Sequence, residues 1–208
     1  MPHKRNIVSD LDHLTPAARA CDAVNTVWRD GDAWWGDNTD ARGFIDAVVA
    51  HRHPDFTRPA AVLGVGGAGR AVASGLASAG VAVIHLLNRT RDSAETAAAH
   101  LAQHHPDTRF VVHSLTQAGF NAVADSLGVV ATCVSGPGLD AIHALSVAPL
   151  SPRVVWVDLN YWCDEVPHAE ALGDRLLSGI PMLAHQAAHA FARWTGVHPD
   201  PNDLPMGT

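Results

Sequence analysis

The sequence predicts an α/β protein built on a doubly wound parallel sheet, with a smaller α/β segment ahead of it. Three observations support this prediction. A glycine-rich turn joins a short apolar strand to a helix, further apolar strands alternate with helical segments, and an amphipathic segment follows the last strand. Such alternation is typical of parallel sheets whose two faces are covered by helices. Ligands of these sheets bind at the carboxyl ends of the strands.

The glycine-rich turn is the most informative stretch. Ala61–Leu63 predicts a strand, a helical pattern runs on to Ala79, and Val81–Leu87 predicts the second strand. Between them, the first glycine of the motif permits a tight turn, the second lets the backbone approach phosphate, and the third lets the helix pack on the strand. We predict that a dinucleotide diphosphate binds at this helix N-terminus. The residues that would bind it are Gly64, Gly66, Gly67, Ala68 and Gly69.

The residues that close the second strand predict which dinucleotide binds. An NAD site usually places an acidic residue about 20 residues beyond the glycines, where it binds the ribose hydroxyl. This chain has no carboxylate there until Asp92. Two arginines and two hydrogen-bonding side chains stand there instead, and they are suited to binding a 2′-phosphate. The alternative interpretation is that the arginines are solvated loop residues. We therefore predict NADP(H) as the cofactor, with phosphate contacts from Asn88, Arg89, Thr90 and Arg91.

The alternation continues to the end of the chain. It predicts a helix over Ser93–His104, a strand at Phe110–Val112, a helix around Leu115–Ala124, and strands at Val129–Val134 and Val154–Leu159. The amphipathic stretch Met182–Trp194 predicts a last helix that ends at Gly196. We expect residues 56–180 to form a Rossmann domain. Residues 181–208 would supply a helix that packs back on the first segment.

The first sixty residues do not resemble a nucleotide-binding unit. Thr15-Pro16 predicts the start of a short helix, and Asp30-Gly31 predicts a hairpin turn between strands at Val24–Trp28 and Ala33–Trp35. Asn38-Thr39-Asp40 then predicts the start of an amphipathic helix. A polar, proline-containing linker follows it. We predict that residues 1–55 form a partial substrate or catalytic domain, also of the α/β kind.

Composition excludes several classes of function. A formal net charge of −7 argues against nucleic acid as a partner, and no apolar run is long enough to span a membrane. We do not expect the polar start to act as a signal peptide, and three scattered cysteines fit a reducing cytoplasm rather than a disulfide framework. These cysteines are Cys21, Cys133 and Cys163. No metal site is predicted, because no set of potential ligands has a known spacing. The paired histidines are interpreted as surface residues: His51, His53, His104 and His105.

Several motifs, in order, resemble those of the shikimate dehydrogenase family. They are Pro2-His3-Lys4, Asp22-Ala23-Val24-Asn25-Thr26, Gly36-Asp37-Asn38-Thr39-Asp40-Ala41-Arg42-Gly43-Phe44, the glycine loop with Asn88-Arg89-Thr90, and Met182–Phe191 with Trp194-Thr195-Gly196. The match runs over nearly the whole chain. It implies an NADP-dependent interconversion of 3-dehydroshikimate and shikimate, or of a related hydroxylated ring acid such as quinate.

The resemblance also implies roles for individual residues. Lys4 and Asp40 would be the catalytic pair. Hydride transfer to a ketone builds negative charge on oxygen, and a nearby ammonium can stabilise that charge and deliver a proton. Asn25 and Gln186 would bind substrate hydroxyls. Tyr161 would lie near the substrate, and Met182 beside the nicotinamide.

The chain also departs from the family pattern. The family has a segment ahead of its Pro-x-Lys motif, with a Ser-x-Ser pair that grips the substrate carboxylate, whereas here Met1 directly precedes Pro2. We therefore expect Lys4 to lie on a frayed terminus. We also expect a bared sheet edge, which a homodimer could cover.

Further departures lie near the expected reaction centre. Pro181 replaces a glycine, Asn160-Tyr161-Trp162-Cys163 replaces a Tyr-x-Pro pattern, and Ala131–Gly136 lacks the usual loop asparagine. A non-catalytic nucleotide-binding protein, or an enzyme of specialised metabolism with an altered substrate, therefore remains an alternative to the family's reaction.

Overall fold

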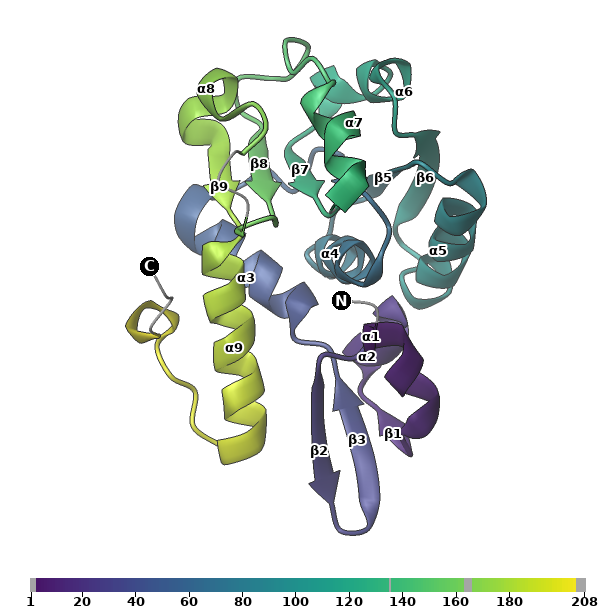
Figure 1. Cartoon of the computed structure of the whole chain (residues 1–208), viewed down its shortest axis with the longest axis vertical. Coiled ribbons are helices and arrows are strands. Elements are labelled where there is room, and N and C mark those ends of the chain that lie inside the picture. Colours follow the sequence, from purple (N-terminus) through teal and green to yellow (C-terminus); the bar gives the residue numbers. More distant parts are fainter. Residues whose placement is uncertain (1–2, 135, 163–165, 205–208) are drawn as a thin grey trace.

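The computed structural model describes residues 3–134, 136–162 and 166–204. Its main element is a six-stranded sheet in the order β6-β5-β4-β7-β8-β9, in which every adjacent pair is parallel. The doubly wound α/β fold predicted from the sequence is confirmed (Figure 1). The strands are β4 (Ala60–Leu63), β5 (Val83–Asn88), β6 (Arg109–Ser114), β7 (Val129–Thr132), β8 (Val155–Asp158) and β9 (Leu176–Ser178).

Helices connect these strands and cover both faces of the sheet. They are α4 (Gly67–Ser78), α5 (Arg91–His104), α6 (Gln117–Asn121), α7 (Leu139–His143) and α8 (Ala169–Leu172). All four residues of β4 are buried, and they alternate between two apolar clusters. Ala60 and Val62 join the cluster of α4 and α5, whereas Ala61 and Leu63 join the cluster of α6 and α7. This strand is apolar throughout because helices cover it on both sides.

The order of the strands fixes where a ligand can bind. The chain enters the sheet at β4, winds outward through β5 and β6, and then returns to β7 on the other side of β4. The crevice at the carboxyl ends of β4 and β7 is therefore the topological switch point, which is the usual ligand site of such sheets. The glycine-rich turn after β4 lies at this point.

The first part of the chain forms a separate three-stranded sheet in the order β1-β3-β2. Its elements are α1 (His3–Asn6), a 3₁₀ turn (Ile7–Asp10), β1 (His13–Leu14), α2 (Pro16–Cys21), β2 (Thr26–Asp30), β3 (Ala33–Asp37) and α3 (Asp40–Arg52). The predicted hairpin is confirmed, since β2 and β3 are antiparallel and Gly31 between them has φ +59°. The predicted start of α2 is also confirmed, because Thr15 accepts a hydrogen bond from the Ala18 N–H.

The last helix, α9 (Ile180–Thr195), returns to the first part of the chain and lies beside α3 (Figure 1). Three polar contacts fix it there. His189 Nε2 lies 2.6 Å from Asp46 Oδ2, Arg193 Nη2 donates to Asp37 Oδ2 at 3.1 Å, and the Trp194 indole N–H donates to the Val27 carbonyl at 3.0 Å. The residues that α9 carries are thereby held close to those that α3 carries.

Helix α3 is also built into the core of the large sheet. Phe44 and Val48 of α3 are fully buried in the same apolar cluster as Val72 and Leu76 of α4. The two helices pack closely at Gly75 of α4. A Cβ at this position would lie 2.6 Å from a backbone oxygen of α3, so only glycine fits there. One hydrophobic core therefore runs from the large sheet into the first part of the chain.

Several elements and element bounds differ from the sequence-based expectations, and three of them lie near the carboxyl ends of the strands. Strand β9 was not expected, because three residues are too few to show a periodicity. Helix α7 was not expected either, since its five residues follow the predicted loop from Ser135 to Gly138. Strand β7 ends at Thr132, two residues before the predicted end, so that Cys133 and Val134 lie beyond it. Ser135 lies outside the described residues.

Two histidines meet on one face of the large sheet. His85 on β5 is buried, and its Nδ1 lies 3.0 Å from Nε2 of His113 on β6. Burial, followed by the charges of His113 and Arg109, lowers the pKa of His85 to about 4. An unfolded histidine has a pKa of about 6.5. The folded protein therefore binds fewer protons than the unfolded chain between these values, and stability is lost as the pH falls through this range.

We expect the free energy of unfolding to decrease between neutral pH and about pH 5, and His85→Leu to flatten that decrease. Urea unfolding of both proteins at the two pH values measures the effect. The exposed His104, replaced by alanine, is the control, and it should leave the slope unchanged. An identical pH dependence in wild type and His85→Leu would contradict the assignment.

Within the described residues, no helix is both long enough and apolar enough to cross a lipid bilayer.

Candidate active site

The glycine-rich turn leaves the start of α4 open. Gly64 has φ +97°, which lets the chain turn sharply after β4. A Cβ on Gly69 would lie 1.9 Å from the Gly64 carbonyl oxygen, so this position requires glycine for the fold itself. In contrast, a Cβ on Gly66 would meet no atom within 4 Å, and no side chain caps the helix. The first turn of α4 therefore faces a pocket with its backbone N–H groups available to an anion.

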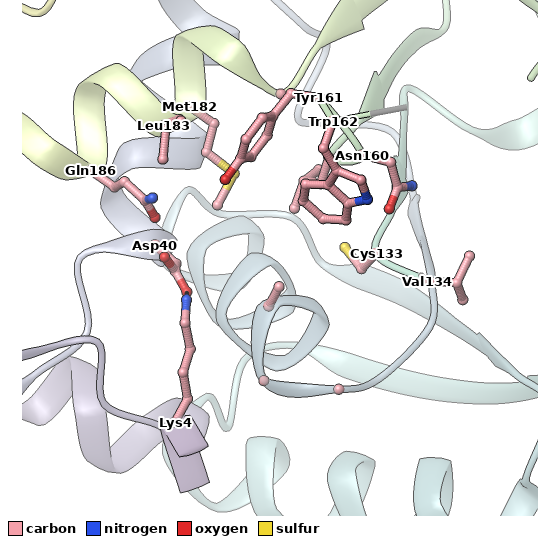
Figure 2. A pocket seen from close by; sticks show the side chains of 15 residues that line it. Lys4, Asp40, Cys133, Val134, Asn160, Tyr161, Trp162, Met182, Leu183 and Gln186 are labelled. Carbon is pink, nitrogen blue, oxygen red and sulfur yellow. Dashed lines mark hydrogen bonds and ion pairs between the residues drawn. The ribbon is translucent and has the colours of Figure 1, made fainter. Parts of the chain in front are cut away.

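Lys4 and Asp40 meet on the other side of that pocket. Lys4 Nζ lies 2.5 Å from Asp40 Oδ2, although 36 positions separate the two residues in sequence (Figure 2). Only 1% of the Asp40 side chain is exposed, against 20% of the Lys4 side chain. The carboxylate is also the first residue of α3, where the helix dipole favours a negative charge. The pair therefore presents an ammonium to the pocket with a buried carboxylate behind it.

The expected fraying of Lys4 is not what the structure shows. Lys4 lies in α1, and its carbonyl accepts a hydrogen bond from the Val24 N–H at 2.8 Å. The next residue, Arg5, donates to Asp22 at 2.8 and 3.1 Å, and the Lys4 side chain lies against Gly67. Contacts from distant parts of the chain thus hold this end in place. The sequence pattern of a short polar segment gives no sign of them.

Asn25 holds the turn that precedes Asp40. Its Nδ2 donates to Asp40 Oδ1 at 2.8 Å and to Thr39 Oγ1 at 3.0 Å, while its Oδ1 accepts from the Thr39 N–H and the Thr26 hydroxyl. Asn38 Oδ1 accepts from the Asp40 N–H at 3.0 Å. These contacts fix the carboxylate from the side opposite Lys4.

Residues after β7, β8 and β9 form the remaining walls of the pocket. Met182, Leu183 and Gln186 come from α9, and Figure 2 shows Gln186 close to Asp40 and Met182 next to Tyr161. The two predicted contacts Tyr161 and Gln186 therefore line one pocket with the predicted catalytic pair. The walls also contain residues that the sequence did not single out as site residues: Cys133, Val134, Leu159, Asn160, Trp162, Gly179 and Leu183. Several of these residues directly follow β7 or β8, and their position at the carboxyl ends of predicted strands could have identified them as site candidates.

Two ionisable groups near this wall, Cys133 and Asp158, have raised pKa values. Burial, and then the charges of Asp158 and Asp40, raise the pKa of the Cys133 thiol well above its ordinary value. Burial also raises the pKa of Asp158, although the backbone N–H and the side-chain amide of Asn160 donate to its Oδ1 at 2.9 and 2.7 Å. Asp158 Oδ2 has no hydrogen-bond partner among the described residues. The thiol is therefore neutral at physiological pH, and Asp158 fixes the start of the segment that carries Tyr161.

Comparison with known proteins places this geometry in a family. A model of the shikimate 5′-dehydrogenase C-terminal domain matches residues 179–202, which contain α9. A curated relative, the shikimate dehydrogenase (NADP(+)) of Methylocella silvestris, is 39% identical over 206 residues, covering 96% of this chain and 70% of the relative. The chain belongs to the shikimate dehydrogenase family.

Solved structures of shikimate dehydrogenase relatives share the fold. Shikimate 5-dehydrogenase from Thermus thermophilus in complex with shikimate is 31% identical with a TM-score of 0.78, covering 97% of this chain and 72% of that one. Quinate dehydrogenase from Corynebacterium glutamicum in complex with NAD is 25% identical with a TM-score of 0.81, over 97% and 72% of the two chains.

The residues at the end of β5 and just after it make different contacts in this member of the shikimate dehydrogenase family. Asn88 is engaged within the protein, since its Oδ1 accepts from the Val65 N–H at 3.4 Å and its Nδ2 donates to the Thr90 carbonyl at 2.8 Å. Arg91 forms an ion pair with Glu95 at 2.7 Å. Arg89 is exposed, and its side chain makes no hydrogen bond or ion pair with the part of the chain that is described. Asn88 thus ties the glycine loop to the strand, whereas Arg89 remains available to a ligand.

Metal ligands were not expected, and no group of three or more His, Cys, Asp or Glu side chains among the described residues could hold a metal ion. Cys21 and Cys133 are free thiols, whereas Cys163 lies outside the described residues. His51, His53 and His104 are exposed, as expected. His105 is only partly exposed, and its Nε2 lies 2.8 Å from the hydroxyl of the buried Ser74. This contact joins α4 to the residue that directly follows α5 and explains the partial burial.

Proposed function

We propose that the chain is an NADP-dependent oxidoreductase that interconverts 3-dehydroshikimate and shikimate, or a closely related hydroxylated ring acid such as quinate. The observation that carries this proposal is the Lys4–Asp40 pair, which lines the same pocket as the glycine loop and Gln186. The names and bound ligands of the relatives support the choice of substrate class and cofactor. The open N-terminus of α4 fits the diphosphate of such a dinucleotide.

The chemistry follows from the pair. When bound, the dinucleotide supplies the hydride for reduction or accepts it in oxidation. In the reducing direction, the Lys4 ammonium donates a hydrogen bond to the ketone oxygen and transfers its proton as negative charge develops there. In the oxidising direction, neutral Lys4 accepts the hydroxyl proton. Asp40 holds the lysine by the 2.5 Å contact, and Asn25 holds Asp40.

The other predicted roles are part of this proposal. Gln186 lies beside the pair and has an amide that can bind substrate hydroxyls, and the Tyr161 side chain borders the same space. Asn25 Nδ2 already donates two hydrogen bonds within the protein, so its first role is to position Asp40. We assign Met182 to the nicotinamide side, the glycine loop to the diphosphate, and Arg89 with Thr90 to the 2′-phosphate.

Oxidation of shikimate by NADP, followed as the absorbance of NADPH, tests the proposal directly. We expect turnover with shikimate or quinate. Calorimetric titration with NADPH separates the alternatives. A protein that binds NADPH and turns over neither acid would have an altered substrate or be non-catalytic, whereas a protein that binds no dinucleotide would overturn the proposal.

Arg89→Ala should weaken NADPH binding about tenfold or more and leave NADH binding almost unchanged, because hydrogen bonds to charged groups contribute about 1.5–3 kcal/mol. Titration of both dinucleotides measures this difference. Arg52→Ala, another exposed arginine at the end of α3, is the control. An equal loss for NADPH and NADH would remove Arg89 from the 2′-phosphate site.

A further inference from the structure

Two aromatic side chains line the pocket, and Trp162 is the more exposed of the two. It follows β8, lines the pocket with Cys133 and Val134, and is 54% exposed. Figure 2 shows its indole between Tyr161 on one side and Asn160 on the other, with Cys133 nearby. A large apolar surface left open to solvent at a site is a common sign of a ligand that covers it.

The neighbouring tyrosine supports the orientation of this ring. The ring centroids of Tyr161 and Trp162 lie 4.9 Å apart at an interplanar angle of 80°, an edge-to-face arrangement. Such pairs are favourable because the positive edge of one ring meets the negative face of the other. Tyr161 thus steadies Trp162 while more than half of the tryptophan surface stays uncovered.

The pocket has two chemically different halves. Lys4, Asp40 and Gln186 give one half its polar groups (Figure 2). Cys133, Val134 and Asn160 lie on the side of Trp162 (Figure 2), and none of the three is charged, because the raised pKa of Cys133 keeps its thiol neutral. A charged half beside an uncharged half suits a hydroxylated substrate next to a flat ring. The glycine loop, where the diphosphate would end, lines the same pocket.

We propose that Trp162 stacks on the nicotinamide ring of the bound dinucleotide and favours its oxidised form. This inference rests on the proposed function. The oxidised nicotinamide is a cationic pyridinium ring, whereas the reduced ring is neutral. The indole face attracts cations electrostatically, and tryptophan is the strongest of the aromatic side chains in this respect. With Trp162, NADP⁺ therefore binds more tightly than it would with an aliphatic side chain in the same place. NADPH gains only the stacking contact, because its nicotinamide ring carries no charge.

Trp162→Leu tests the inference, since leucine keeps an apolar cover but removes the aromatic face. We expect the Kd of NADP⁺ to rise about two- to thirtyfold, the range that cation–π energies correspond to, and the Kd of NADPH to rise by less. Trp162→Phe should restore part of the preference. Binding is measured by isothermal titration calorimetry, without substrate. Trp34→Leu is the matched control, because Trp34 is similarly exposed at 46% but lies on β3 in the hairpin.

A fragment without nicotinamide, 2′-phospho-ADP-ribose, identifies the ring that Trp162 contacts. Its Kd should be the same for wild type and Trp162→Leu. The inference would be overturned if Trp162→Leu lowered the affinity for the fragment as much as that for NADP⁺, if it lowered the affinities for NADP⁺ and NADPH equally, or if it lowered neither. Each of these outcomes would leave the proposed function intact. If the wild-type protein bound none of the three ligands (the fragment, NADP⁺ or NADPH), both the inference and the proposed function would be overturned.

Discussion

Replacement of Lys4 by alanine should lower kcat by about 10²- to 10⁴-fold and leave the Kd of NADPH nearly unchanged. The range is that of general acid–base catalysis by one positioned side chain. The Lys4 atoms next to Gly67 are the aliphatic Cβ and Cδ, whereas the ammonium pairs with Asp40. Steady-state kinetics with shikimate and calorimetry with NADPH measure the two effects.

Lys4→Arg distinguishes proton transfer from a loss of folding. Removal of Lys4 leaves the buried Asp40 without its ion-pair partner, which is itself destabilising. Arginine keeps the positive charge, but it does not release a proton at the pH of the assay. The arginine variant should therefore fold, bind NADPH and remain at least about a hundredfold slower than wild type. Full turnover by either variant would remove Lys4 from the chemistry.

Gly69→Ala should abolish dinucleotide binding because it distorts the loop that forms the site. The new methyl group would lie 1.9 Å from the Gly64 carbonyl oxygen, so α4 has to move away from β4. Both elements belong to the buried core, and we expect a loss of about 1–3 kcal/mol in the free energy of unfolding, or more. Urea unfolding and NADPH titration measure the two losses.

Gly66→Ala is the matched variant that separates binding from folding. Its methyl group meets no protein atom within 4 Å, and Gly66 has φ −67°, which alanine adopts without strain. Stability should stay within about 0.5 kcal/mol of wild type. NADPH affinity should fall, since the methyl group occupies the space that phosphate requires. Wild-type affinity in Gly66→Ala would place the diphosphate elsewhere, and unchanged stability in Gly69→Ala would contradict the close packing.

The sequence was sufficient for those parts of the fold that depend on local chemistry. The glycine loop, the Asp30-Gly31 hairpin and the Thr15 cap each have a backbone requirement that only a few residue types satisfy. Strands β1 and β9, with two and three residues, carry no such requirement. They form because a neighbouring strand supplies their hydrogen bonds, and the sequence of so short a strand does not indicate that neighbour.

The site was predictable only in part for the same reason. The family resemblance indicated Lys4, Asp40 and Gln186, and the fold brings them together from α1, α3 and α9. It gave no indication that α1 is held by the Val24 N–H or that Asn88 is engaged with Thr90. Such contacts depend on where distant segments meet, which residue types alone do not determine.

The single core that joins α3 to the large sheet has a thermodynamic consequence. Phe44 and Val48 share one buried cluster with Val72 and Leu76, so we expect the four residues to unfold together, because neither helix can expose its apolar face without exposing the other. The chain should therefore melt in one cooperative transition rather than as two independent units. A dinucleotide that binds at the glycine loop should therefore raise the melting temperature of the segment that carries Asp40 as much as that of the sheet itself. Cofactor binding would thus stabilise the segment that carries Asp40 together with the large sheet.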